Sequence, residues 1–236
     1  MDNITIIGTS HVARQSLDEV RQFIEVMKPD IIAVELDRKR FLALKYGKKR
    51  KIGFRDVFRV GVKGFLFSVI GAYAEKKIGE SVGLEPGAEM IAAIRLAKKN
   101  NIRLELIDQD IELTLKRFSQ TFSWREKWHI VKDIFNSIFF RKREMKKLGI
   151  ENLDLSKVPA GEVIEKMMKK VKVDYPNIYK VLVEERNSVM ADNLWILANE
   201  NPRKKILAVV GAGHKEGIEL LLNREGHAVS YSLSVS

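Results

Sequence analysis

The sequence contains no cysteine, and this absence excludes several kinds of chemistry at once. Without thiols the chain cannot form disulfides, bind a metal through thiolates or use a cysteine nucleophile. A chain without cysteine is typical of a reducing compartment. The first residues, MDNITIIGTSH, also lack the basic and apolar parts of a signal peptide. We therefore expect a cytoplasmic protein.

Long hydrophobic runs and two familiar enzyme motifs are missing as well. The uncharged stretch at residues 64–74 spans 11 residues, whereas a helix that crosses a bilayer needs roughly 20 apolar residues. The Gly-x-Ser-x-Gly elbow of serine hydrolases is absent, and so is the third glycine of a dinucleotide fingerprint. The sequence therefore predicts neither a membrane-spanning helix nor these two enzyme classes.

Acidic residues are scarce between Arg38 and Lys63, where eleven lysines and arginines stand against one acid, Asp56. Such a tract, followed by the apolar stretch at 64–74, suits an anionic membrane surface or another acidic partner. An ordinary solvated surface is the simpler interpretation. Nucleic acid ranks last because no recognition motif accompanies the charge. The glycines of this region also leave open a dimer contact, and with it a homo-oligomer.

Short runs rich in isoleucine, valine and leucine predict strands that are buried on both faces, as in a parallel sheet. The runs lie at residues 3–8, 30–36, 102–107, 206–211 and 228–233. Between the first two, apolar residues recur at steps of three and four and predict a helix, capped by Ser16 and ended before Pro29. Two more helices are predicted beside the strands, at residues 85–100 and 215–226.

Two long segments have helical patterns, at about residues 38–80 and 111–200. Pro176 suits the start of the last helix in the second segment. We predict a single α/β domain over residues 1–236, with a mostly parallel central sheet flanked by helices and these segments as helical insertions.

Polar side chains stand where four of the predicted strands end. They are His11, Glu35, Asp37, Asp108, Asp110 and His214. Because the carboxyl ends of parallel strands meet at one edge of a sheet, where ligands bind, we expect these side chains to converge. Two imidazoles and a carboxylate suit Mn²⁺, Co²⁺, Zn²⁺ or Fe²⁺. An ion with open positions can activate water for hydrolysis of an amide or ester.

Each of these residues also has an ordinary structural interpretation. A histidine or acid at a strand end often caps the next helix, and an acid can pair with a nearby arginine such as Arg38 or Arg40. The patterns around His129 and His227 favour structural roles for both. Arg186, on a helix that is otherwise apolar along one face, could reach the edge of the sheet or form a surface ion pair with Glu185 or Asp192.

Four stretches follow one another along the chain: GTSHVARQSLDEVRQFIEVMKPDIIAVELDRKR, EPGAEMIAAIRLAKKNNIRLELIDQDIELTLKRF, EERNSVMADNL and VVGAGHKEGI. Together they resemble the TraB family, which includes the pheromone shutdown proteins TraB and PrgY and is related to GumN and the Tiki metalloproteases. The resemblance covers roughly residues 3–226. It implies a fold like that of erythromycin esterase and ChaN-like proteins. One departure is Gln109, where the family usually has arginine.

The resemblance also implies a site with two Gly-x-x-His motifs, an acid and an arginine. On this chain these are His11, Glu35, Arg186 and His214, and Glu89 stands in a further motif near a helix start. Similarity to the Tiki proteins implies a peptidase that depends on Mn²⁺ or Co²⁺, with Zn²⁺ as the alternative ion. A peptide-binding or membrane-surface module without catalysis is the alternative function.

These considerations assign a role to each candidate residue. His11, Glu35 and His214 are predicted to be metal ligands or their immediate partners. Glu89 or Asp108 would serve as a base or a supporting acid, and Arg186 would stabilise an oxyanion or orient a substrate carboxylate.

Overall fold

The computed structural model describes residues 3–9, 14–46, 88–121, 123, 125–126 and 161–223. Within these residues four parallel strands form one sheet in the order β1-β4-β2-β3. The strands are β1 (Ile4–Thr9), β2 (Ile31–Val34), β3 (Arg103–Leu106) and β4 (Ile206–Gly211). The predicted parallel α/β fold is confirmed, with strands at four of the expected places. The fifth predicted strand, at residues 228–233, lies outside the described residues.

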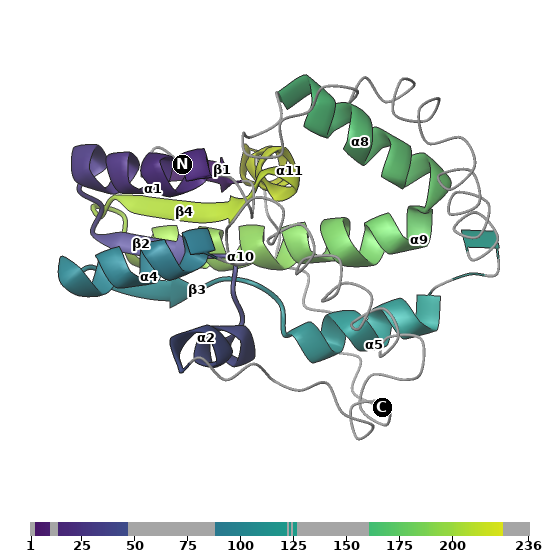
Figure 1. Ribbon diagram of the computed structural model, residues 1–236, viewed down its shortest axis with the longest axis horizontal. Helices are drawn as coiled ribbons and strands as arrows, with labels where there is room; N and C mark the ends of the chain where they lie inside the picture. Colours follow the sequence, from purple (N-terminus) through teal and green to yellow (C-terminus); the bar gives the residue numbers. More distant parts are fainter. Residues whose placement is uncertain are drawn as a thin grey trace.

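Helices cover both faces of this sheet (Figure 1). On one face lie α1 (Arg14–Met27) and α4 (Ala88–Lys99), which pack beside each other. On the other lie α10 (Glu185–Glu200) and α11 (Ala212–Asn223). Successive residues of a strand point to opposite faces. Ile31 of β2 therefore packs in the cluster with α10, whereas Ile32 packs in the cluster with α1 and α4.

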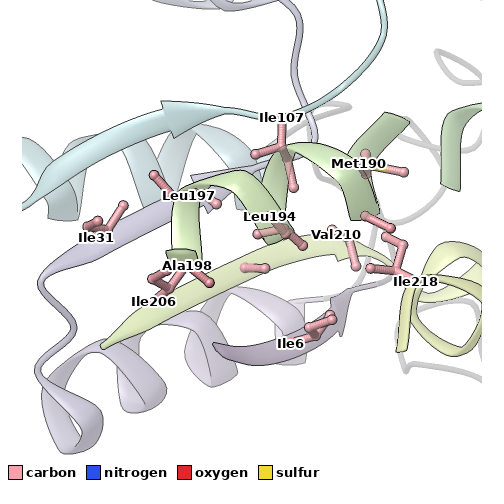
Figure 2. Packing of buried hydrophobic residues seen from close by; sticks show 13 residues of the cluster. Ile6, Ile31, Ile107, Met190, Leu194, Leu197, Ala198, Ile206, Val210 and Ile218 are labelled. Carbon is pink, nitrogen blue, oxygen red and sulfur yellow. The ribbon is translucent and has the colours of Figure 1, made fainter. Parts of the chain in front are cut away.

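The core between α10 and the sheet holds that helix in place. Figure 2 shows Leu194, Leu197 and Ala198 of α10 against Ile31 of β2 and Ile206 of β4. All five are buried, and full burial of a large aliphatic side chain contributes roughly 1.5–3 kcal/mol. The position of the first turn of α10 follows from this packing.

The predicted insertion at 111–200 is too long, because its last part is α10, which packs on the sheet. The remaining described helices belong to the two predicted insertions. They are α2 (Arg38–Lys45), α5 (Ile111–Thr121), α8 (Gly161–Asp174), α9 (Pro176–Tyr179) and the π-helix η1 (Lys180–Glu184). α5, α8 and α9 lie beyond the carboxyl ends of the strands (Figure 1). Pro176 starts α9 as predicted, and α9, η1 and α10 follow one another without a break and lead back to the sheet. Among the described helices, none is long and apolar enough to cross a membrane.

Two helices start earlier than the sequence pattern indicates. α1 begins at Arg14, so the prediction that Ser16 caps it is wrong. A capping residue contributes only about 1 kcal/mol, and packing of an amphipathic face can move the start of a helix against that preference. α11 begins at Ala212, directly after β4, and not at Lys215. His214 therefore lies in the first turn of a helix.

The buried carboxylate of Glu126 fixes the start of α9. It accepts hydrogen bonds from the backbone N–H groups of Asn177 at 2.7 Å and Ile178 at 3.2 Å, and from Ser123 N–H at 3.0 Å. The first N–H groups of a helix have no partner within it, and Glu126 supplies one. Burial alone would raise the pKa of the Glu126 carboxyl, but hydrogen bonds from Ser123, Asn177 and Ile178 outweigh it and lower that pKa.

We expect Glu126→Gln to lower the free energy of unfolding by about 1–3 kcal/mol at neutral pH, because the amide cannot accept all of these bonds. Since the pKa of Glu126 is lower in the folded chain, its contribution is fully present above the unfolded value of roughly 4.3. It is lost as the pH falls through the folded value. Urea denaturation of both proteins at neutral pH and below about pH 4 should show the difference shrinking in acid.

Glu185→Gln is the matched control. Glu185 forms a partly exposed ion pair with Arg117 at 2.6 Å, and pairs of that kind contribute roughly 0–1 kcal/mol. A loss for Glu126→Gln that is no larger than the control, or that stays the same in acid, would contradict the capping role.

Candidate functional site

Arg186 lies at the centre of a cluster of charged side chains at the carboxyl edge of the sheet. Its Nε and Nη2 donate to the two oxygens of Asp108, at 3.1 and 2.5 Å, and Nη2 also donates to Glu35 Oε1. Nη1 donates to His214 Nε2 at 3.0 Å. Only 14% of the Arg186 side chain is exposed, and the Asp108 side chain is fully buried. The structure thus brings together four of the predicted residues, from the ends of β2, β3 and β4 and from α10.

A π-helix turn precedes Arg186 and contributes to its position. In η1 the backbone bond spans five residues, so that Glu185 N–H donates to Lys180 O. Val181 and Arg186 are five residues apart and both point into the protein. An α-helix, with about 3.6 residues per turn, would place two such residues on different faces. π turns are frequent at functional sites, and here Leu182 O, inside the turn, accepts from Arg186 Nη1 at 3.3 Å.

Glu35 and His214 face each other beside the guanidinium. Glu35 Oε2 accepts the backbone N–H of Gly211 at 2.6 Å, and Oε1 lies 3.5 Å from His214 Nε2. The other ring nitrogen, Nδ1, lies 2.7 Å from Asn187 Oδ1. A guanidinium has donors only, so Nε2 is the acceptor of the Arg186 bond. The ring is then neutral, with its proton on Nδ1 and its lone pair toward Glu35 and Arg186.

Asp108 is held as a carboxylate by two guanidinium groups. Arg40 of α2 also donates to it through Nη2, while Arg40 Nε donates to Asp37 at 2.6 Å. Burial alone would raise the pKa of the Asp108 carboxyl, but hydrogen bonds and charge from Arg186 and Arg40 hold the pKa below its usual value. Burial would likewise lower the pKa of Arg186, but Asp108 and Glu35 raise it, so the guanidinium stays charged.

Other predicted residues lie outside this cluster. Asp37 caps α2, accepting from the N–H groups of Lys39 and Arg40, so the capping interpretation of strand-end acids is confirmed there. Asp110 accepts from the backbone N–H of Glu112 at the start of α5 and pairs with Lys39 at 2.8 Å.

Glu89 is buried in the first turn of α4, on the face of the sheet opposite to α10 and α11. His11, His129 and His227 lie outside the described residues, as does most of the basic tract between Arg38 and Lys63.

The alternative of a surface ion pair for Arg186 is wrong. Glu185 pairs with Arg117, at 2.6 Å, and Arg186 points inward to Glu35 and Asp108. The two residues are neighbours on α10, but Glu185 points toward Arg117 of α5 while Arg186 points toward the edge of the sheet. Burial of a guanidinium requires charged partners, and these are the two acids at the ends of β2 and β3.

The donor atoms at this edge of the sheet are of the types that bind a divalent metal ion. His214 Nε2 and Glu35 Oε1 are the nitrogen and oxygen donors that Mn²⁺, Co²⁺ and Zn²⁺ accept. Among the residues that the structure describes, no three His, Asp or Glu side chains form a group able to hold a metal. The third predicted ligand, His11, is outside those residues. Arg186 donates to both Nε2 and Oε1, so an ion would compete with the guanidinium for these two atoms.

Asn187 is the residue of this site that the sequence analysis missed. It follows Arg186 directly and lies on the buried face of α10 with Met190 and Leu194. A polar side chain on an apolar helix stripe must find a hydrogen-bond partner, and this pattern was the available signal. Its partner is His214, 27 positions along the chain, and no local pattern identifies a contact of that range.

The sequence matches the TraB/PrgY/gumN family over residues 2–230. It is 39% identical to "Uncharacterized protein MJ1365" of Methanocaldococcus jannaschii over 227 residues, which cover 94% of this chain and 54% of that protein. It is 24% identical to each of the TraB domain-containing proteins of Mus musculus and Homo sapiens, over 92% of this chain and 61% of theirs. The chain thus spans about 54–61% of the length of these relatives. The chain belongs to the TraB/PrgY/gumN family.

Proposed function

We propose that this chain is a metal-dependent hydrolase that acts on peptides at the cluster around Arg186. The observation that carries this function is the facing pair of His214 Nε2 and Glu35 Oε1, 3.5 Å apart, beside a guanidinium that Asp108 binds through two hydrogen bonds. The choice of a peptide as substrate comes from the resemblance to the Tiki metalloproteases and the pheromone shutdown proteins.

His11, Glu35 and His214 would hold the ion. Mn²⁺ or Co²⁺ is the favoured ion and Zn²⁺ the alternative. When bound, such an ion lowers the pKa of a water molecule and polarises a carbonyl group. Hydrolysis then joins the water oxygen to the carbonyl carbon, breaks the carbon–nitrogen bond and passes a proton to the leaving amine.

The protein side chains supply fixed charge and a base. Arg186 is a charged donor with its direction set by Asp108, and a preorganised donor stabilises negative charge as it develops on a carbonyl oxygen. Asp108 is a poor base because its lowered pKa makes the carboxylate a weak proton acceptor and its oxygens already accept hydrogen bonds. Its role is to hold Arg186. Glu35 Oε1 would be the base only in an arrangement in which it is a partner of the ion and not its ligand. Where Glu35 binds the ion, Glu89 is the alternative base.

The first test is metal content and peptidase activity of protein purified without chelator. We expect bound Mn²⁺ or Co²⁺, peptide cleavage that chelator abolishes and added ion restores, and loss of both in His11→Ala and His214→Ala. His129→Ala is the control, since the sequence assigns that histidine to an ordinary helix position. Absence of metal, together with unchanged behaviour of His11→Ala and His214→Ala, would overturn the function. Tight binding of a peptide that is recovered intact would indicate the peptide-binding module.

The second test concerns Arg186. A lysine is a point charge and cannot bond to Asp108, Glu35 and His214 in the way that a planar guanidinium does. We therefore expect Arg186→Lys to lower kcat by about 100- to 1,000-fold, the usual effect of losing one preorganised donor. Thermal unfolding should be measured on the same samples, so that loss of fold is separated from loss of catalysis.

Arg117→Lys is the matched control for that change. Arg117 also binds a carboxylate through two nitrogens, with Nε at 3.2 Å and Nη2 at 2.6 Å from Glu185, but the pair is partly exposed. Its replacement should leave kcat near the wild-type value. An Arg186→Lys protein that is folded and as active as wild type would exclude the role given to Arg186.

A further inference from the structure

We propose that Asn187 is a positioning residue that fixes the His214 imidazole as the Nδ1–H tautomer, and that Gly217 provides the space Asn187 needs. The orientation of the ring stands on geometry alone. Its use by a metal ion or as a base rests on the proposed function.

The first observation is the burial of Asn187 among apolar side chains. Its neighbours on the same face of α10, Met190 and Leu194, are fully buried, and Asn187 itself is 5% exposed. A buried amide is costly unless it is hydrogen-bonded. Its Oδ1 lies 2.7 Å from His214 Nδ1, and since Nε2 accepts from Arg186, it is Nδ1 that donates to Asn187.

The second observation is the position of Gly217, one helical turn after His214 on α11. A Cβ atom at this position would lie 2.2 Å from Asn187 Nδ2 and 3.1 Å from its Cγ. Any side chain there would displace the amide that binds the ring. Glycine inside a helix is less stable than alanine, but here it allows this contact between α10 and α11.

The two hydrogen-bond partners of the His214 ring, Arg186 and Asn187, bind different ring nitrogens. Which nitrogen of a histidine carries the proton is set by the hydrogen bond that the other nitrogen makes. Arg186 favours the same tautomer, but it occupies Nε2, the atom that a metal ion or a proton would use. Asn187 binds the far side of the ring and does not compete. It can therefore keep the ring oriented when Nε2 takes another partner.

The test is NMR of the full chain with ¹⁵N-labelled histidine, in chelator, with the His214 signals identified by their loss in His214→Gln. In wild type we expect a slowly exchanging proton on Nδ1 and a pyridine-like shift at Nε2. Asn187→Ala should lose the slowly exchanging Nδ1 proton signal, because Nδ1–H then has no acceptor on Asn187 and exchanges with water. Asn187→Asp, which keeps an acceptor oxygen, should retain the wild-type spectrum of the ring.

Asn193→Ala is the matched control, because Asn193 is a half-buried asparagine of the same helix that donates to Ile107 O at 2.9 Å. It should leave the His214 signals unchanged even where stability falls. A slowly exchanging Nδ1 proton and unchanged ring shifts in Asn187→Ala would overturn the assignment.

Gly217→Ala tests the second half of the inference with Asn187 intact. It should reproduce the loss of the Nδ1 proton signal. Gly213→Ala is its control, because a Cβ there would meet only the flexible end of Met168, at 3.3 Å. Wild-type ring signals in Gly217→Ala would show that Gly217 has no such role.

A titration with MnCl₂ then connects the ring to the proposed function. Loss of a group that orients a metal-binding histidine typically lowers metal affinity by about 10- to 100-fold, and we expect that loss in Asn187→Ala and recovery in Asn187→Asp. If wild type binds no Mn²⁺, the proposed function fails while the NMR result for Asn187 stands. If the ring signals do not respond to Asn187→Ala, the inference fails whatever the affinity for Mn²⁺.

Discussion

The buried guanidinium of Arg186 is the constraint on which the other features of this site depend. Removing a cation from water is costly, and partners with good geometry must compensate for it. Asp108 and Glu35 supply two carboxylates, from the ends of β3 and β2, and α10 supplies the cation. These elements can only meet if the strands are parallel and end at the same edge. The charge cluster therefore depends on the parallel arrangement of the strands.

The same interactions connect the site to regions that lie beyond the sheet. Asp108 is shared between Arg186 and Arg40, so the start of α2 is held against the end of β3. The η1 turn joins Arg186 to α9, whose first N–H groups are bound by Glu126. Residues 176 to 200 thus form one continuous helical segment that carries Arg186 and joins the Glu126 cap to the sheet.

His214 and Glu35 are bound by the guanidinium at the atoms that would face an ion under the proposed function. Under that proposal an ion would have to replace Arg186 at these two atoms. Asp108 would still bind the guanidinium, and Asn187 binds the ring nitrogen that faces away from the ion.

The sequence by itself determined the four described strands, the helical character of the described parts of the two long segments, and the helix start at Pro176, because burial periodicity and proline geometry act on neighbouring residues. It also placed Glu35, Asp108 and His214 at strand ends. Only the tertiary structure decided that β4 lies between β1 and β2, which brings His214 to Glu35. It also decided that α11 starts at Ala212 and that Asn187 fits against Gly217. These features depend on packing between segments that are remote in the chain, and local propensity contains no information about such contacts.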